Sequence, residues 1–288
     1  MRFHFTDRGN AANEDFAYAG ELPGGGSYGV VIDGATGLAP LPPVSDGFAT
    51  NAQWFAHSVG AAVCRALEAG ERAEDALRGA VLAACAELED ALGCKVSRLD
   101  SAAVPSATLA LAVERGSEVE LWGLADSPLV ALLRTGEVVV STDEVLESLD
   151  ARAVDLMVER SAGRGLTGPE RRALVSDVLL ANRRLRNTEG GYWCLDPTGD
   201  GLEHARRLAL PRVDVVAVAG MSDGLFRAFG QYGMARLDGL AGLTYCSVQR
   251  LVDRMRVLEA ADPSYERFPR LKLGDDASMF WIGVAHGA

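Results

Sequence analysis

The N-terminal part of the chain begins with short strand-like runs and continues with two longer amphipathic stretches. Residues 2–5, 15–18 and 28–32 are alternating or apolar and are separated by clusters of Gly and Asn, a pattern that predicts a β-meander. From about 50 to 67, and again from about 73 to 92, apolar residues recur every three or four positions. This spacing predicts two helices, which would cover one sheet.

The middle of the chain returns to strand-like patterning and then becomes helical. Apolar runs separated by Arg-Gly and Thr-Gly turn signals predict strands at about 107–113, 119–124, 129–134 and 138–140. The segment from about 143 to 186 is helical in pattern and is the most basic part of the chain. Its arginines could attract an anionic substrate as part of a flap. Pairing with nearby glutamates also explains such a charge-rich helix, and we favour the interpretation as a solvated face.

The C-terminal part alternates again between strands and helices. The patterns predict a strand at 191–195, a buried strand at 213–218, a helix at about 248–259 and a final strand at 278–284. Hairpins join most of the predicted strands, and few β-α-β alternations occur. This order favours an α+β fold, with antiparallel sheets flanked by helices, over a doubly wound parallel sheet.

Charge and composition narrow the classes of partner. The chain has 28 Lys and Arg residues against 40 Asp and Glu residues, and the net charge of −12 argues against nucleic acid or an anionic membrane as a partner. No apolar run reaches the roughly 18 residues of a membrane span, and the first residues lack the features of a secretory signal. We therefore expect a cytoplasmic protein. The four histidines are too widely spaced for a zinc site, so any metal should be held by oxygen.

Acidic residues recur at the ends of the predicted strands. Asp33, Asp223 and Asp275 each adjoin an apolar run, and Glu14 and Asp15 open the second strand. Each Asp-Gly pair by itself is better explained as a turn. Together, however, the acids predict a site for hard divalent cations such as Mg²⁺ or Mn²⁺, which prefer carboxylate, carbonyl and water oxygens.

The order of these acidic positions is similar to that of a known family. Over nearly its whole length, the chain resembles the metal-dependent Ser/Thr protein phosphatases of type 2C. The segments that carry the resemblance are Asn13-Glu14-Asp15, Val31-Ile32-Asp33-Gly34, Ser106-Ala107-Thr108, Leu124-Ala125-Asp126-Ser127, Ser141-Thr142-Asp143, Met221-Ser222-Asp223-Gly224-Leu225 and Asp275-Asp276-Ala277-Ser278. Each segment alone is a weak match, whereas their order and spacing together are specific.

The resemblance implies a fold and a metal centre. The fold would be a four-layer αββα sandwich of two antiparallel sheets flanked by helix pairs. A single domain would span residues 1–288, with a helical flap-like insertion at about 143–190. Two Mn²⁺ or Mg²⁺ ions would be bound. The implied ligands are Asp33, Asp223 and Asp275 for one ion and Glu14, Asp33 and the carbonyl of Gly34 for the other, with Asp126 helping to hold a weaker third ion.

The resemblance also implies a reaction. A hydroxide that bridges the two metals would attack the phosphorus of a phosphate monoester. Asp15 and Asp33 would be the catalytic residues, with Asp15 orienting the metal-bound water. The substrate would be phosphoserine or phosphothreonine in a protein.

The chain departs from the family where the substrate phosphate would be bound. Asn10 stands where the family usually has an arginine that grips the phosphate, and Arg2 or Arg8 would have to replace it. Pro128 replaces the arginine of the family's Gly-Asp-Ser-Arg element, and no histidine stands beside Asp33 as a proton donor. These departures leave a phosphorylated small molecule open as the substrate.

Two other functions compete with this interpretation. The first is a Ser222-dependent α/β-hydrolase, because residues 220–224 fit Gly-x-Ser-x-Gly after a buried strand, and Asp275 or Asp276 and then His286 follow in the required order. The missing β-α alternation argues against it. The second is a non-catalytic, phosphatase-like regulatory domain that binds metal without turnover.

Overall fold

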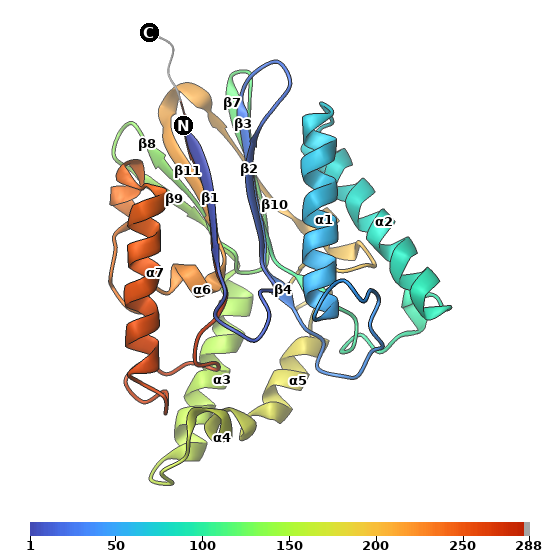
Figure 1. Ribbon diagram of the computed structural model, residues 1–288, viewed down its shortest axis with the longest axis vertical. Helices are drawn as coiled ribbons and strands as arrows, with labels where there is room; N and C mark the ends of the chain where they lie inside the picture. Colours follow the sequence, from blue (N-terminus) through green and yellow to red (C-terminus); the bar gives the residue numbers. More distant parts are fainter. Residues whose placement is uncertain (285–288) are drawn as a thin grey trace.

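Two five-stranded antiparallel sheets lie face to face, with helices outside them (Figure 1). The computed structural model describes residues 1–284. In the first sheet the strands run in the order β1 (Arg2–Asp7), β12 (Ala277–Gly283), β11 (Val215–Met221), β8 (Leu129–Leu133) and β9 (Val138–Ser141). In the second sheet the order is β10 (Arg206–Pro211), β7 (Glu118–Leu124), β6 (Leu109–Arg115), β3 (Ser27–Ile32) and β2 (Phe16–Glu21). A small separate sheet pairs β4 (Gly34–Ala35) with β5 (Ser106–Ala107).

Helices cover the outer faces of both sheets and one end of the sandwich (Figure 1). The long helices are α1 (Asn51–Glu68) and α2 (Ala73–Leu92) beside the second sheet, and α7 (Tyr245–Ala260) beside the first. An insertion between β9 and β10 contains α3 (Glu144–Ser161), α4 (Gly168–Ala173) and α5 (Ser176–Arg184). The short helices are α6 (Asp223–Phe226) and the 3₁₀ turns η1 (Val96–Arg98), η2 (Asp200–His204), η3 (Arg212–Asp214) and η4 (Leu237–Gly242).

The helix bounds follow from the local sequence. The hydroxyl of Thr50 accepts a hydrogen bond from the backbone N–H of Gln53 at 3.0 Å and so caps the start of α1. Gly93 follows the last residue of α2 with a φ of 65°, the left-handed conformation that ends many helices. Thr244 caps α7 in the same way as Thr50 caps α1. The predicted helices at 50–67, 73–92 and 248–259 are thus confirmed to within a few residues.

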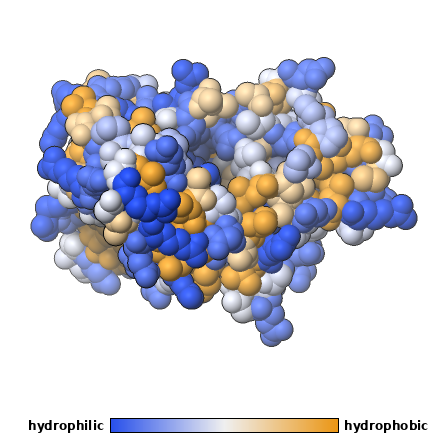
Figure 2. All heavy atoms as spheres, turned by 90° about the horizontal axis from the view of Figure 1, so that it is seen from below, coloured by the Kyte–Doolittle hydropathy of each residue, from blue (hydrophilic) through white to orange (hydrophobic). Residues whose placement is uncertain are grey.

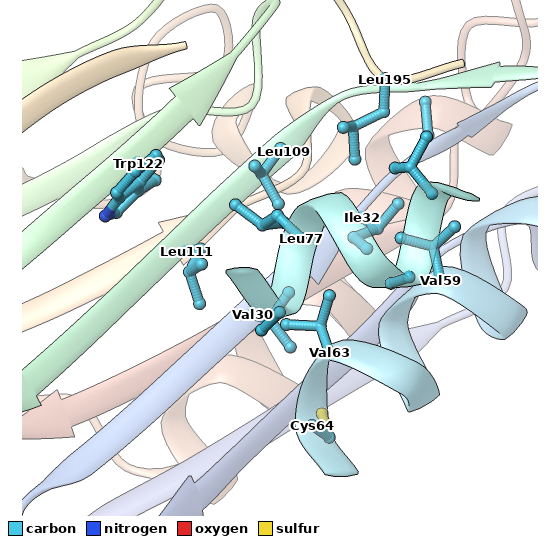
Figure 3. Close-up of a cluster of buried hydrophobic side chains, with 14 of the residues drawn as sticks. Val30, Ile32, Val59, Val63, Cys64, Leu77, Leu109, Leu111, Trp122 and Leu195 are labelled. Atoms are coloured by element: carbon cyan, nitrogen blue, oxygen red, sulfur yellow. The ribbon is translucent and has the colours of Figure 1, made fainter. Parts of the chain in front are cut away.

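Separate apolar cores hold the layers together. Between α1, α2 and the second sheet, residues from both helices meet residues of β3 and β6, among them Val59, Leu77, Ile32 and Leu109 (Figure 3). On the far side, residues of α7 pack against the first sheet. Between the two sheets, Phe280 of β12 is fully buried. The predicted α+β fold with two antiparallel sheets is confirmed, although the outer layer beside the first sheet has only one long helix within residues 1–284.

The first strand does not join the predicted β-meander. β2 and β3 form the expected hairpin, from Phe16 opposite Ile32 to Glu21 opposite Ser27. β1 instead pairs with β12, from Arg2 opposite Ile282 to Asp7 opposite Ala277. The meander prediction was wrong for β1 because local periodicity does not encode which strand is the partner. As a result, residues 8–15 cross from one sheet to the other at one end of the sandwich.

One strand was missed and another was wrongly predicted. Residues 191–195 form only isolated bridges, such as Leu195 opposite Ala107, within the described part of the chain. The edge strand is β10, which pairs with β7 from Arg206 opposite Gly123 to Pro211 opposite Glu118. Most of its residues are exposed, so it lacks the apolar alternation that signals a half-buried strand.

The insertion lies across one end of the two sheets (Figure 1). Seen from that end, hydrophobic and hydrophilic side chains are mixed over the surface (Figure 2). Among residues 1–284, no helix combines the length and the apolar character needed to cross a membrane.

Candidate metal centre

Four aspartates from the ends of strands are among the residues that line one cavity where the sheets meet the helical insertion. Asp33 follows β3, Asp126 follows β7, Asp223 follows β11, and Asp275 precedes β12. The cavity has a volume of about 190 Å³. Because the strands are antiparallel, the ends of β3, β7 and β11 and the start of β12 reach the same edge of the sandwich. The fold therefore gathers acids that are far apart in sequence.

Asp33 and Gly34 are held tightly at the start of the small sheet. The carbonyl oxygen of Asp33 accepts a hydrogen bond from the backbone N–H of Thr108 at 2.9 Å. Gly34 pairs with Ala107. A Cβ atom on Gly34 would lie 2.7 Å from the carbonyl oxygen of Glu14, so only glycine fits here. The backbone of Glu14 is thereby brought directly against the Asp33-Gly34 turn.

Asp276 organises the loop that carries Glu14 and Asp15. Its carboxylate accepts hydrogen bonds from the backbone N–H groups of Gly9 and Glu14, each at 2.8 Å, and of Asn10 at 3.3 Å. A Cβ atom on Gly9 would lie 2.0 Å from the carbonyl oxygen of Asp275, which shows how closely this loop approaches the start of β12. One carboxylate therefore fixes the N-terminal acids against the C-terminal ones.

Asp15 is buried with little compensation for its charge. Burial and the negative charge of Asp276 raise the pKa of Asp15 to about 7. Its Oδ2 atom is shielded from solvent and has no hydrogen-bond partner among the described residues. A carboxylate in this position has a free oxygen for a cation or a water molecule.

The other acids repel one another in the same way. Burial and the charges of Asp15 and Asp223 raise the pKa of Asp33 well above its ordinary value. Burial and the charges of Asp223 and Asp150 do the same for the pKa of Asp126. Ionisation of Asp33 and Asp126 therefore costs free energy in the folded protein. A cation bound beside them would offset that cost.

Asp223 and Asp275 are instead paired with cations of the chain itself. Arg227 Nη2 donates to Asp223 Oδ2 at 2.9 Å and to Asp275 Oδ2 at 3.2 Å. Lys272 Nζ donates to Asp275 Oδ1 at 2.9 Å. Although burial opposes it, the positive charges of Lys272 and Arg227 hold the pKa of Asp275 below its ordinary value.

The donor set fits hard divalent cations, but it is not closed around one. Within residues 1–284, no three Asp, Glu, His or Cys side chains are gathered closely enough to enclose an ion. The acids around the cavity nevertheless supply only oxygen donors, as Mg²⁺ and Mn²⁺ prefer, and at Asp33 and Asp126 the nearby cations do not offset burial and the neighbouring carboxylates. The residues present therefore fit such a metal, with Arg227 and Lys272 as competing partners.

Comparison with known proteins identifies the family. The family model for protein phosphatase 2C matches residues 6–262. The chain belongs to the protein phosphatase 2C family. It is thereby a metal-dependent protein phosphatase, a phosphoric monoester hydrolase. A search of the curated proteins finds no match.

Solved structures share the protein phosphatase 2C fold with this chain. The catalytic domain of the Ser/Thr phosphatase PstP, solved with two manganese ions, is 19% identical with a TM-score of 0.55, covering 99% of this chain and 98% of that one. PstP/Ppp of Mycobacterium tuberculosis is 18% identical with a TM-score of 0.56, covering 99% of each chain. Stp1 of Staphylococcus aureus is 14% identical with a TM-score of 0.57, covering 99% of this chain and 95% of that one. At these identities, the likeness establishes the fold.

Asp126 follows a residue with a left-handed backbone conformation. Ala125 has a φ of 54°, a left-handed conformation that glycine adopts most easily. Its carbonyl oxygen accepts a hydrogen bond from Arg206 Nη2 at 2.8 Å, which supports this conformation. The turn directs Asp126 to the cavity although alanine replaces the glycine of the family's Gly-Asp-Ser-Arg element.

Glu14 lies beside the cavity without lining it. Its carboxylate accepts hydrogen bonds from the hydroxyls of Thr36 and of Thr50, the latter at 2.7 Å. The N-terminus of α1 is close by, since Thr50 is its cap. A metal-binding role for Glu14 stays a prediction.

The sequence-based candidates for phosphate binding lie away from the cavity or already have partners. Arg2 forms an ion pair with Glu21 at 2.5 Å and stands at the far end of β1, roughly 17 Å along the strand from Asp7. The prediction for Arg2 was wrong, because β1 runs away from the site. Arg8 is exposed and donates to the carbonyl oxygen of Ala11 at 3.4 Å. Asn10 Nδ2 donates to Asp275 Oδ1 at 2.9 Å.

Several charged residues at the cavity were not identified from the sequence. They are Asp150, Arg172, Arg183, Arg227 and Lys272. Burial and the charge of Asp223 raise the pKa of Asp150 to about 6. The sequence spacing could have indicated two of these cations. Arg227 lies four residues after Asp223, and Lys272 lies three residues before Asp275. Ion pairs commonly form at these spacings. Asp150 and the other two arginines lie in the stretch interpreted as a solvated face.

Ser222 is not placed as the nucleophile of an α/β-hydrolase. Its hydroxyl is fully buried, accepts a hydrogen bond from the backbone N–H of Ser278 at 2.9 Å and donates to the carbonyl oxygen of Asp276 at 3.3 Å. β11 is antiparallel to both of its neighbours, β8 and β12. His286, the third member of that hypothesis, lies outside the described residues. Ser222 ties the two acidic segments together.

Proposed function

We propose that the carboxylates around the cavity hold two divalent cations and that the chain removes phosphate from phosphoserine and phosphothreonine in proteins. The observation that carries the proposal is the convergence of Asp33, Asp126, Asp223 and Asp275 on one cavity. Asp33, Asp223 and Asp275 would hold one ion, and Glu14, Asp33 and the carbonyl of Gly34 the other. Asp126 would help to hold a weaker third ion, with Asp150 and Asp223 nearby.

Mn²⁺ is the ion we expect at this centre. A solved relative with the same fold contains two manganese ions, and the oxygen donors here suit Mn²⁺ or Mg²⁺. Bound cations would acidify water and neutralise charge on the phosphoryl oxygens.

The chain's own residues would position the water and the substrate. Asp15 is buried, is fixed by the loop that Asp276 holds, and has an oxygen without a partner, so it is suited to orient a water molecule and to accept its proton. Asp33 lies at the cavity and would share this task. The side chain of Asp15 is buried, so its carboxylate is shielded from bulk water.

The test is phosphate release from phosphopeptides and from a panel of phosphorylated metabolites, with Mn²⁺ or with EDTA. Wild type should hydrolyse phosphopeptides with Mn²⁺ and lose this activity in EDTA. Asp223→Asn should lower the activity by more than about a hundredfold. Replacing a residue that only supports a metal ligand already lowers activity by up to about a hundredfold, and loss of a ligand itself should cost more. The control is Asp238→Asn, since Asp238 is exposed and pairs with Arg236.

The outcomes separate the alternatives. Activity that survives both EDTA and Asp223→Asn would refute the proposal. Turnover confined to the metabolite panel would assign a small-molecule substrate instead. Calorimetric binding of Mn²⁺ without hydrolysis of any substrate would assign a non-catalytic, phosphatase-like domain.

A further inference from the structure

The helical insertion places arginines on the wall of the cavity. Arg172 of α4 and Arg183 of α5 line the same cavity as Asp33 and Asp223. The insertion thus contributes two cations, together with Asp150, to the cavity that the acids at the sheet ends also line. A phosphate monoester bound by divalent cations at the carboxylates would present its remaining oxygens to such a wall.

Arg183 is tethered beside the Asp33-Gly34 turn. Its Nη1 donates to the hydroxyl of Ser106 at 2.9 Å. Ser106 belongs to β5 and pairs with Ala35, which is two residues after Asp33. In the described part of the chain, Ser106 is the hydrogen-bond partner of this guanidinium, and the contact uses one of its five N–H groups. The others remain for an anion.

Arg172 carries a buried nitrogen without a partner. Its Nε atom is shielded from solvent and, among residues 1–284, has no hydrogen-bond acceptor. Buried polar groups are nearly always hydrogen-bonded, so an orphan donor beside a cavity indicates that a partner is bound there during function. The planar guanidinium is suited to two oxygens of a phosphate.

Other arginines of the insertion are engaged in structural contacts. Arg160 pairs with Asp177 at 2.9 Å, and Arg186 with Asp196 at 3.5 Å. Arg171 donates to the carbonyl oxygen of Ser264. Arg184 is exposed. Within this stretch, Arg172 and Arg183 are the arginines that line the cavity.

We propose that Arg183 and Arg172 bind the substrate phosphate and so replace the arginine that is absent at Asn10. This inference rests on the phosphatase function proposed above. The amide of Asn10 is bonded to Asp275 and carries no charge for an anion. Arg227 and Lys272 are paired with Asp223 and Asp275, whereas the two arginines of the insertion line the cavity without a carboxylate ion pair among the described residues.

The test compares Arg183→Ala, Arg183→Lys and Arg172→Ala with Arg184→Ala, which removes an exposed arginine next to Arg183. The readouts are kcat and KM for p-nitrophenyl phosphate and for a phosphopeptide, and the inhibition constant of inorganic phosphate, all with Mn²⁺. Loss of a charge-assisted contact should raise KM and the inhibition constant by roughly ten- to a hundredfold. Arg183→Lys keeps the positive charge but loses the planar guanidinium that can donate two hydrogen bonds at once. Its effect should therefore be smaller than that of Arg183→Ala.

A phosphate-binding role requires equal effects on both substrates, because p-nitrophenyl phosphate and the phosphopeptide share only the phosphoryl group. Effects on the phosphopeptide alone, or constants equal to those of Arg184→Ala, would overturn the proposal. Mn²⁺ affinity measured by calorimetry should not be weaker in any of the four variants, and circular dichroism checks that each is folded. Ser106→Ala removes the tether but keeps the guanidinium, and should raise KM less than Arg183→Ala.

Binding of inorganic phosphate to the Mn²⁺-loaded protein, measured by calorimetry, separates the two proposals. If wild type hydrolyses no phosphate ester, the phosphatase function fails. Phosphate binding that is present in wild type and Arg184→Ala but lost in Arg183→Ala would still support the arginine site. Equal phosphate binding in all of these proteins would overturn it.

Discussion

Nη2 of Arg227 donates to Oδ2 of Asp275 at 3.2 Å. The same nitrogen reaches Oδ2 of Asp223 at 2.9 Å, so one guanidinium bridges two acids that we assign to the metal centre. The side chain of Arg227 is only 19% exposed, and water therefore screens these pairs poorly. The chain thus supplies its own counter-charge at the place where a divalent cation would be held.

Replacement of Arg227 should change metal affinity. In Arg227→Met, Mn²⁺ no longer competes with a guanidinium for Asp223 and Asp275, and a positive charge near the ion is lost. We expect Mn²⁺ to bind more tightly, by about tenfold, which corresponds to the typical worth of one charge-assisted hydrogen bond. Calorimetric titration measures the effect. Arg236→Met is the control because its ion pair with Asp238 is exposed. Unchanged or weaker Mn²⁺ binding would count against this competition.

The metal-free protein should lose stability as the pH rises. Burial raises the pKa of Asp150 to about 6 and that of Asp15 to about 7, whereas unfolded carboxyl groups titrate near pH ~4. Between these values the folded state binds more protons than the unfolded state, so the free energy of unfolding falls with rising pH. This contribution is fully present below about pH 4 and is lost above about pH 7.

Asp150→Asn should make this decline smaller between about pH 4 and 6, because the amide does not titrate. Urea unfolding of metal-free protein at a series of pH values measures it. Asp155→Asn, an exposed acid on the same helix, is the control. An Asp150→Asn profile parallel to that of wild type would show that Asp150 is not strained by its surroundings.

We expect the stability of the fold to require glycine at position 220, because the ring of Phe280 leaves no space for a side chain there. A Cβ atom on Gly220 would lie 2.3 Å from Cε1 of Phe280, and one on Gly29 of the facing sheet would lie 2.3 Å from Cδ2 of the same ring. The ring therefore has no room to retreat. Gly220→Ala should lower the free energy of unfolding by about 1–3 kcal/mol, the usual cost of overpacking a core.

Denaturant unfolding tests this packing. Gly220→Ala combined with Phe280→Leu should be less destabilised than the sum of the single variants, because the smaller side chain leaves room for the methyl group. Gly239→Ala is the control, since a Cβ atom there meets no atom within 4 Å, and its effect should stay within about 0.5 kcal/mol. Strict additivity would contradict a direct clash.

Ser222→Ala should leave phosphatase activity largely intact. The hydroxyl of Ser222 bonds to the backbone of Ser278 and Asp276, so its loss should cost about 1–3 kcal/mol of stability through the unsatisfied N–H group. Activity with Mn²⁺ and thermal unfolding are the measurements. If Ser222→Ala abolished hydrolysis while Asp33→Asn did not, Ser222 would be the nucleophile and the metal centre would be excluded.

Local sequence patterns predicted much of the fold. The helices α1 and α2 were predicted almost to the residue because their apolar positions recur with helical spacing. β10 was missed because an exposed edge strand carries no such periodicity. The pairing of β1 with β12 joins the two ends of the described chain, and no local pattern encodes that partner.

For the site, the sequence by itself determined the acids that end strands, because an Asp after a buried run must emerge at a sheet edge. Asp33, Asp223 and Asp275, which the strand ends indicated, line the cavity, as does Asp126, which the family resemblance implied. Glu14 and Asp15, which belong to the same pattern, do not line it. Only the tertiary structure decided which charges face them. The orientation of the insertion helices sets whether Asp150, Arg172 and Arg183 meet solvent or the cavity, and this depends on packing between segments that are distant in sequence. Strand pairing likewise places Arg2 away from the site, because the pairing of β1 with β12 sets the direction in which β1 runs.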